Sequence, residues 1–115
     1  MASTTGVLFR ATALKADASE DLYVRTMGFR PVKFAVKNRS NNVMVEWSAG
    51  FPEGTNEKTV ALGDRSEVTS ACEPVDADSD GNPGIKIPAG LTDINDNDGE
   101  DLVVEAWGGA PALMP

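Results

Sequence analysis

The sequence contains no histidine, and this absence removes several kinds of chemistry. Ser–His–Asp and Cys–His catalytic groups, imidazole metal sites and histidine pH switches all need that side chain. A pair of carboxylates can hydrolyse glycosides, but that reaction also needs a cleft with aromatic platforms. Only 6% of the residues are aromatic, and most stand at positions expected to face a core. The composition therefore predicts that the chain is not an enzyme.

Cysteine is nearly absent as well, since Cys72 is the single thiol. It can form neither an internal disulfide nor a thiolate metal cluster, so stability must come from packing. No basic residue stands near it in the sequence, which predicts a buried, inert thiol. Long apolar runs and a basic leader followed by an apolar stretch are also missing, so we expect neither a membrane span nor a signal peptide.

Basic residues are scarce, with 10 Lys and Arg against 18 Asp and Glu, for a net charge of −8. Such a surface repels phosphate backbones, so no nucleic-acid partner is expected. The charge is uneven: residues 1–58 carry 8 basic and 6 acidic side chains (+2), and residues 59–115 carry 2 and 12 (−10). We expect the acidic loops to face solvent and the N-terminal part to face a partner.

What the sequence has is alternation of apolar and polar residues in short segments between turn residues, which is typical of an all-β protein. Residues 32–37 and 43–48 alternate on either side of the Asn-rich turn 38–42, so they predict a hairpin with Trp47 on the core face. About seven to eight short antiparallel strands are expected in one β-sandwich or small barrel. The other strands are expected at 7–14 and 22–27, which would form a first hairpin, and at 58–62, 66–70, 85–87 and 102–107.

A length of 115 residues predicts a single domain, placed at residues 1–107 with a polar lead-in at 1–6. Residues 108–115 form a C-terminal extension without a strand or helix pattern. Its apolar residues would be left in water unless they contact a neighbour, although a frayed terminus is the alternative. Residues 1–14 and 108–115 are therefore candidate contact arms. The candidate interface residues are Phe9, Arg10, Trp107, Leu113 and Met114.

The segment 76–81, Asp-Ala-Asp-Ser-Asp-Gly, matches the first half of a calcium-binding loop, with Asp76, Asp78 and Asp80 as candidate ligands. Calcium is the one cofactor that the sequence suggests. The match does not extend to the second half of the loop. Position 12, which is a glutamate in such calcium-binding loops, is Ile87 in this sequence. The acidic segment 93–101 could complete a site if the two loops lie together. The favoured interpretation is nevertheless a pair of solvated turns rich in Asp, Asn and Gly, so no cofactor is expected.

The order GFRPVKFAVKNRSNN from Gly28, followed by VMVEWSAGFPEGTNEKTVALGDRS, resembles a group of small structural proteins of tailed bacteriophages. The shared features are a Gly-Phe-basic-Pro corner, an alternating strand, an Asn-rich turn, and a strand ending in Glu46-Trp47. The next shared feature is a segment with Gly50, Gly54-Thr55 and Lys58-Thr59. Residues 84–95 are similar to a strand of the group and to the short spacer that precedes its last strand. The resemblance covers roughly residues 24–107. This sequence departs from the group in the acidic insert 76–80 and in its C-terminal end.

The resemblance implies a virion protein that decorates the head, that is, a cement protein present in many copies on the capsid surface. Its partner would be the major capsid protein, it would assemble in multiple copies or as a homo-oligomer, and it would be made in the host cytoplasm. Neither nucleic acid nor membrane is an expected partner. The alternatives are a tail, baseplate or other minor virion component, and a calcium- or carbohydrate-binding β module.

Overall fold

The computed structural model describes residues 8–108, except for the side chain of Thr12. Within these residues the chain forms nine strands and no helix. The strands are β1 (Leu8–Lys15), β2 (Leu22–Val24), β3 (Pro31–Asn38), β4 (Val43–Ser48), β5 (Asn56–Thr59), β6 (Arg65–Val68), β7 (Glu73–Val75), β8 (Gly84–Ile87) and β9 (Asp101–Gly108).

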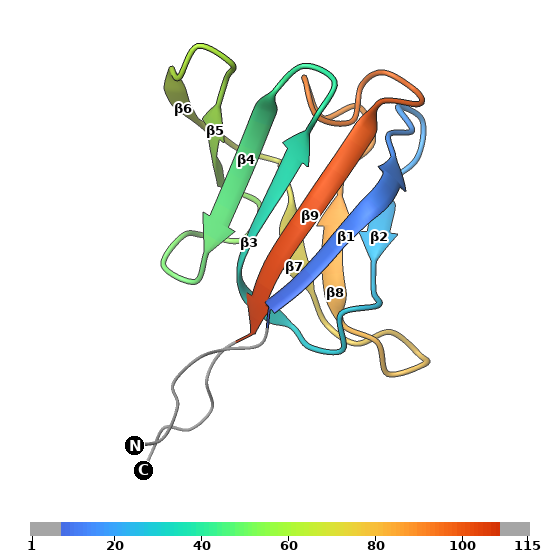
Figure 1. Cartoon of the computed structure of the whole chain (residues 1–115). Coiled ribbons are helices and arrows are strands. Elements are labelled where there is room, and N and C mark those ends of the chain that lie inside the picture. The colour runs from blue at the N-terminus through green and yellow to red at the C-terminus, as the bar shows by residue number, and fades with distance from the viewer. Residues whose placement is uncertain (1–7, 109–115) are drawn as a thin grey trace.

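The strands form two antiparallel sheets that pack as a β-sandwich (Figure 1). The larger sheet has the order β1-β9-β3-β4-β5-β6, and the smaller has the order β2-β8-β7. In Figure 1 the smaller sheet lies behind the larger one, and the β5–β6 hairpin extends to one side. The all-β prediction is thus confirmed, with more strands than expected. The extra strand β7 contains Pro74 and has only three residues, so no alternation marks it.

Two of the predicted hairpins are confirmed. In β3 and β4, Val36 lies opposite Val45 and Phe34 opposite Trp47. The β5–β6 hairpin forms as well, with strands that begin one or two residues earlier than expected. The hairpin predicted at 7–14 and 22–27 is wrong, because β1 pairs with β9 and β2 pairs with β8 in the other sheet. Residues 16–21 therefore cross between the sheets instead of closing a hairpin.

The core lies between the sheets and is built from alternate residues of the central strands. Phe34, Val36, Val45, Val104 and Leu102 are fully buried, and the ring of Phe34 stacks on Trp47 with centroids 5.5 Å apart. Each fully buried large apolar side chain contributes about 1.5–3 kcal/mol to the free energy of unfolding. The alternation that predicted the β3–β4 hairpin is therefore also the pattern that builds the core.

Three fully buried asparagines, Asn38, Asn56 and Asn95, fasten loops to this core. The Asn56 amide brackets Cys72, since its Nδ2 donates to the Cys72 carbonyl at 3.0 Å and its Oδ1 accepts from the Cys72 N–H at 3.0 Å. The Asn38 Nδ2 donates to the carbonyl of Ile94 and to the carboxylate of Glu100. Because buried polar groups are costly unless paired, these bonds hold the loops in one arrangement.

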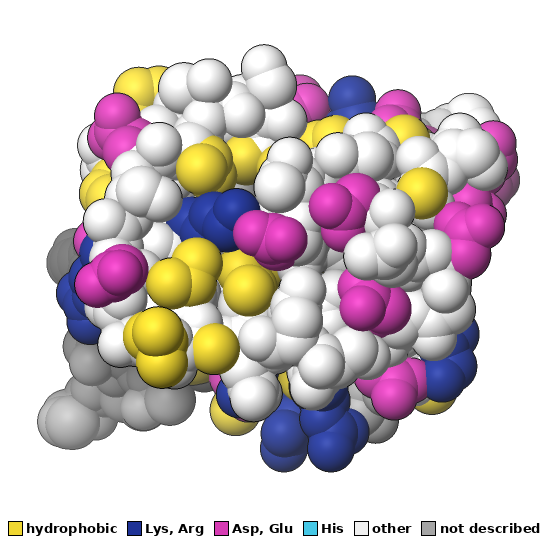
Figure 2. Space-filling model, turned by 90° about the horizontal axis from the view of Figure 1, so that it is seen from above, with side chains coloured by type: hydrophobic (Ala, Val, Ile, Leu, Met, Phe, Trp, Pro, Cys, Tyr) yellow, Lys and Arg dark blue, Asp and Glu magenta, His cyan; other side chains and the backbone are white. Residues whose placement is uncertain are grey.

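The two ends of the sandwich differ. At one end Leu8 pairs with Trp107, so the first and last described strands begin and finish side by side (Figure 1). We call this the terminal end. The opposite end carries the acidic loop 93–101. Figure 2 looks down on that end and shows acidic side chains spread over much of it, with hydrophobic side chains gathered on one side.

Candidate functional site

The aspartates proposed as calcium ligands lie in the β7–β8 loop. Asp76 accepts a hydrogen bond from Arg30 Nε at 2.8 Å. Asp78 Oδ1 accepts the backbone N–H groups of Asn82 at 3.0 Å and Asp80 at 2.9 Å, and Arg25 Nε lies 3.6 Å from its other oxygen. The hydrogen bond from Asn82 is the main cause that lowers the pKa of Asp78 below its ordinary value. The loop is therefore a turn closed by its own backbone and two arginines.

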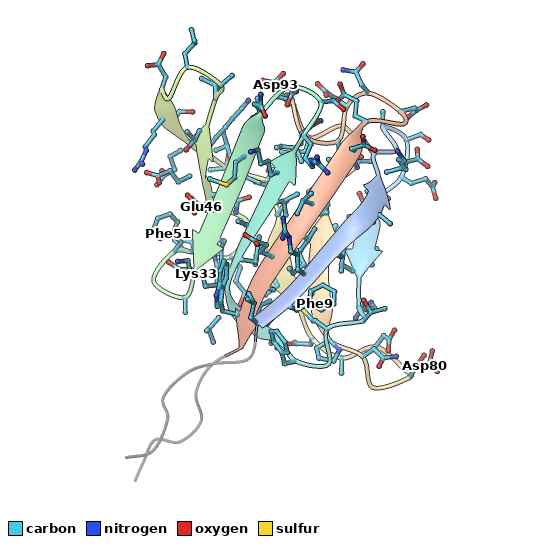
Figure 3. The ribbon with its side chains drawn as sticks, viewed as in Figure 1. Phe9, Lys33, Glu46, Phe51, Asp80 and Asp93 are labelled. Carbon is cyan, nitrogen blue, oxygen red and sulfur yellow. The ribbon has the colours of Figure 1, made fainter. Side chains whose placement is uncertain are left out.

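The two acidic segments do not meet. Figure 3 shows Asp80 and Asp93 at opposite ends of the sandwich, so the expectation that segment 93–101 completes a site with segment 76–81 is wrong. Asp93 instead pairs with Lys58 at 2.9 Å. Within residues 8–108 no group of three or more acidic or cysteine side chains is arranged to hold a metal ion. The sequence does not show that the two loops lie at opposite ends of the strands, because this depends on how the whole chain folds.

The candidate interface residues fall on two faces of the larger sheet. Phe9 packs against the hydrophobic core, whereas Arg10 is exposed on the outer face with its Nε 3.6 Å from Glu105 Oε2. A single flat partner can touch only one of these faces. Trp107 lies on the outer face, and the ammonium of Lys33 is 5.0 Å from its ring centroid. Leu113 and Met114 lie outside the described residues.

An exposed group of apolar side chains gathers at the terminal end. Leu8 is 60% exposed and lies opposite Trp107, which in turn lies opposite Lys33. Phe51, 39% exposed, shares a hollow of about 150 Å³ with Lys33. We call Leu8, Lys33, Phe51 and Trp107 the terminal patch. Trp107 was predicted from the sequence as an interface residue, but Leu8 was not. Successive side chains of a strand point to opposite faces, so a core-facing Phe9 implies that Leu8 is on the outer face.

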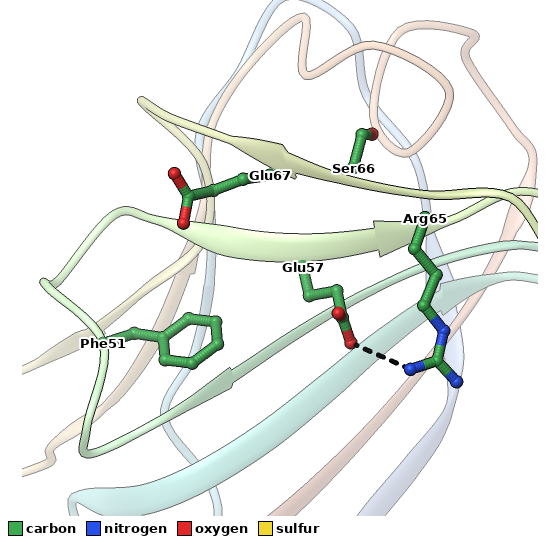
Figure 4. A pocket seen from close by; sticks show the side chains of 5 residues that line it. All are labelled: Phe51, Glu57, Arg65, Ser66 and Glu67. Carbon is green, nitrogen blue, oxygen red and sulfur yellow. Dashed lines mark ion pairs between the residues drawn. The ribbon is translucent and has the colours of Figure 1, made fainter.

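A second hollow, of about 190 Å³, opens on the outer face beside Phe51 (Figure 4). Its lining includes Glu57, Glu67 and Arg65, and Arg65 lies 3.6 Å from Glu57. Carboxylates beside an exposed aromatic ring are suited to binding cationic groups. The outer face therefore offers charge and apolar area for binding, from residues on β4, β5 and β6.

Cys72 is fully buried, as predicted, and burial raises the pKa of its thiol. We therefore expect Ellman's reagent to leave the native protein unlabelled over an hour and to label one thiol per chain in guanidinium chloride. The measurement is the absorbance of the released thiolate. Rapid labelling of the native protein would show that the Asn56–Cys72 region opens frequently.

No protein-family model, curated protein or solved structure matches this chain. In the part of the chain that the structure describes, no helix is long and apolar enough to cross a membrane.

Proposed function

We propose that the chain is a structural protein of a tailed-bacteriophage particle that binds the outer surface of the head as a decoration protein. The observation that carries this proposal is the terminal patch, which places a half-buried tryptophan, a cation and exposed apolar side chains beside Leu8 and Gly108, the first and last described residues. Aromatic residues are enriched at the centres of protein interfaces. The proposed contact surface is this patch, and residues 1–7 and 109–115, which adjoin it in the sequence, belong to the candidate contact arms.

The positions of the phage-like motifs support the same proposal. The corner Gly28–Pro31 leads into β3, and Phe29 packs so closely on Gly108 that a side chain there would lie 3.0 Å from its ring. Trp47, near the end of β4, donates a hydrogen bond from its Nε1 to the carbonyl of Pro52 in the loop that follows. Two of the motifs of the resemblance, the corner Gly28–Pro31 and Glu46-Trp47, therefore lie at the start of β3 and near the end of β4.

The distribution of charge gives the domain an orientation. The acidic loop 93–101 lies at the end opposite the terminal patch, where it would face solvent and favour solubility (Figure 2). At the terminal end, the acidic residues Asp76 and Asp78 are faced by Arg30 and Arg25. The partner would be the major capsid protein, with many copies bound on one shell.

The proposal is tested first by location. Antibodies against the chain should label the heads of purified phage particles in immunogold electron microscopy. Labelling of tails or baseplates would show instead that the protein belongs to that part of the virion. Its absence from purified particles would overturn a structural role.

The contact surface is tested by binding to heads that lack the protein. Deletion of residues 109–115, or Trp107→Ala, should weaken binding at least about tenfold while the melting temperature stays within a few degrees. Glu20→Ala, at an exposed residue of the opposite end, is the matched control and should bind as the wild type does. Binding at wild-type affinity by both patch variants would show that the terminal end is not the contact.

A further inference from the structure

The outer face of the larger sheet is left open, because the smaller sheet packs on the other face. The register of the strands aligns one row of side chains across this face. Arg10 lies opposite Glu105, Glu105 opposite Ala35, and Ala35 opposite Glu46. Glu46 then lies opposite Glu57, and Glu57 opposite Glu67. The row therefore begins with a cation on β1 and finishes with three carboxylates on β4, β5 and β6.

The basic part of the face extends beyond this row. Arg10, Lys37 and Arg39 surround a hollow of about 320 Å³, whose lining also includes Glu105, the ion-pair partner of Arg10, and the apolar residues Ala35, Met44 and Val103. Lys33 stands on the same strand, β3, at the terminal end. We call the β1-β9-β3 part the basic half and the β4-β5-β6 part the acidic half. Figure 3 shows Lys33 and Glu46 on the two strands that meet at the boundary.

Several charges on this face have no ion-pair partner among the residues that the structure describes. The ion pairs among residues 8–108 include Arg10 with Glu105 and Arg65 with Glu57. None of them includes Lys37 or Arg39 in the basic half, or Glu46 or Glu67 in the acidic half. Like charges placed directly opposite on neighbouring strands are destabilising. The three aligned glutamates therefore favour a partner that brings cations to them, and the basic half favours one that brings anions.

We infer that the outer face of the larger sheet binds the same face of a second copy of this chain. A two-fold axis parallel to the strands, above the β3–β4 boundary, places the basic half of each copy on the acidic half of the other. The strand order then sets Arg10 on β1 over β6 of the second copy, where Glu67 lies. It also sets Glu105 on β9 over Glu57 on β5, and each of these two carboxylates already has an arginine partner in its own chain, Arg10 and Arg65 respectively. The apolar floor of the basic hollow adds buried area. This inference goes beyond the proposed capsid contact, because it rests on the charged row across the sheet. The terminal patch borders that row at one end of the same face, where Lys33 and Trp107 lie.

The test is the mass of the purified full-length chain by sedimentation equilibrium over a wide concentration range. The wild type should approach twice the monomer mass at low salt and dissociate in 1 M salt, where the screening length falls to about 3 Å. Lys37→Glu/Arg39→Glu makes both halves acidic, and Glu46→Lys/Glu67→Lys makes both halves basic. Each variant alone should associate at least about tenfold more weakly than the wild type.

An equimolar mixture of the two variants is the decisive sample. Under two-fold symmetry both contacts between an acidic and a basic copy are attractive, so the mixture should form heterodimers. Glu20→Lys/Asp80→Lys changes the net charge as the basic variant does, but at exposed positions off this face, and it should dimerise normally. A wild type that stays monomeric, variants that dimerise unchanged, or a mixture that stays monomeric would each overturn the inference.

Discussion

Gly84→Ala should unfold the protein or destabilise it by about 4 kcal/mol or more, which is an exceptional effect for the addition of one methyl group. A Cβ atom at this position would lie 1.9 Å from the Val24 carbonyl oxygen and 2.9 Å from its carbon. Both atoms belong to the backbone of β2, the strand paired with β8. They cannot move away without breaking the smaller sheet. The loss should appear as a lower urea midpoint or as insoluble expression.

Gly50→Ala is the matched control for this substitution. Nothing lies within 4 Å of a Cβ at Gly50, and its backbone is not among the positive-φ positions. Its effect should stay within about 0.5 kcal/mol. If Gly84→Ala had the same urea midpoint as Gly50→Ala, β2 and β8 would not be packed as described.

The second large effect is expected at Asn95, which is fully buried. Its Oδ1 accepts the Asp17 N–H at 2.7 Å, and its Nδ2 donates to the carbonyls of Pro88 at 3.1 Å and Glu20 at 3.2 Å. Asn95→Ala would leave one N–H and two carbonyl groups without these partners. An unsatisfied buried group costs about 1–3 kcal/mol, and because these three bonds are only part-buried each loss should lie near the low end of that range, for a total of about 3 kcal/mol.

Denaturant unfolding of Asn95→Ala beside Asn97→Ala measures this loss. Asn97 is exposed in the same loop, so its replacement should change the free energy of unfolding by less than about 0.5 kcal/mol. Equal effects at the two positions would mean that water replaces the Asn95 amide in the variant. The loop would then not hold the crossing between the two sheets.

Local patterns in the sequence predicted the local part of this fold. Val32–Lys37 and Val43–Ser48 alternate strictly and are joined by turn residues, so their pairing needed no long-range information. The partners of β1 and β2 could not be found this way, because both are distant in sequence and are selected by packing of the whole sandwich. The short strand β7 was missed for want of any periodic signal.

The candidate sites were predicted less well, and for a related reason. The phase of β9 correctly put Trp107 on the face opposite Val104, since that is a property of one strand. The calcium hypothesis depended on where two loops lie, and the fold places them at opposite ends. The row of glutamates on β4, β5 and β6 depends on the register of three strands, which composition and spacing do not specify.

The central position of β9 has a consequence for biosynthesis. This strand lies between β1 and β3, yet it follows the other eight described strands in sequence. The meander from β3 to β6 can form as soon as those residues leave the ribosome, but β1 has no place in the sheet until β9 arrives. Until then the apolar residues of β1 and β3 are exposed on the nascent chain. We therefore expect that folding is completed only after β9 has been synthesised, and that it is slow and dependent on chaperones, as is typical of proteins with long-range strand pairing.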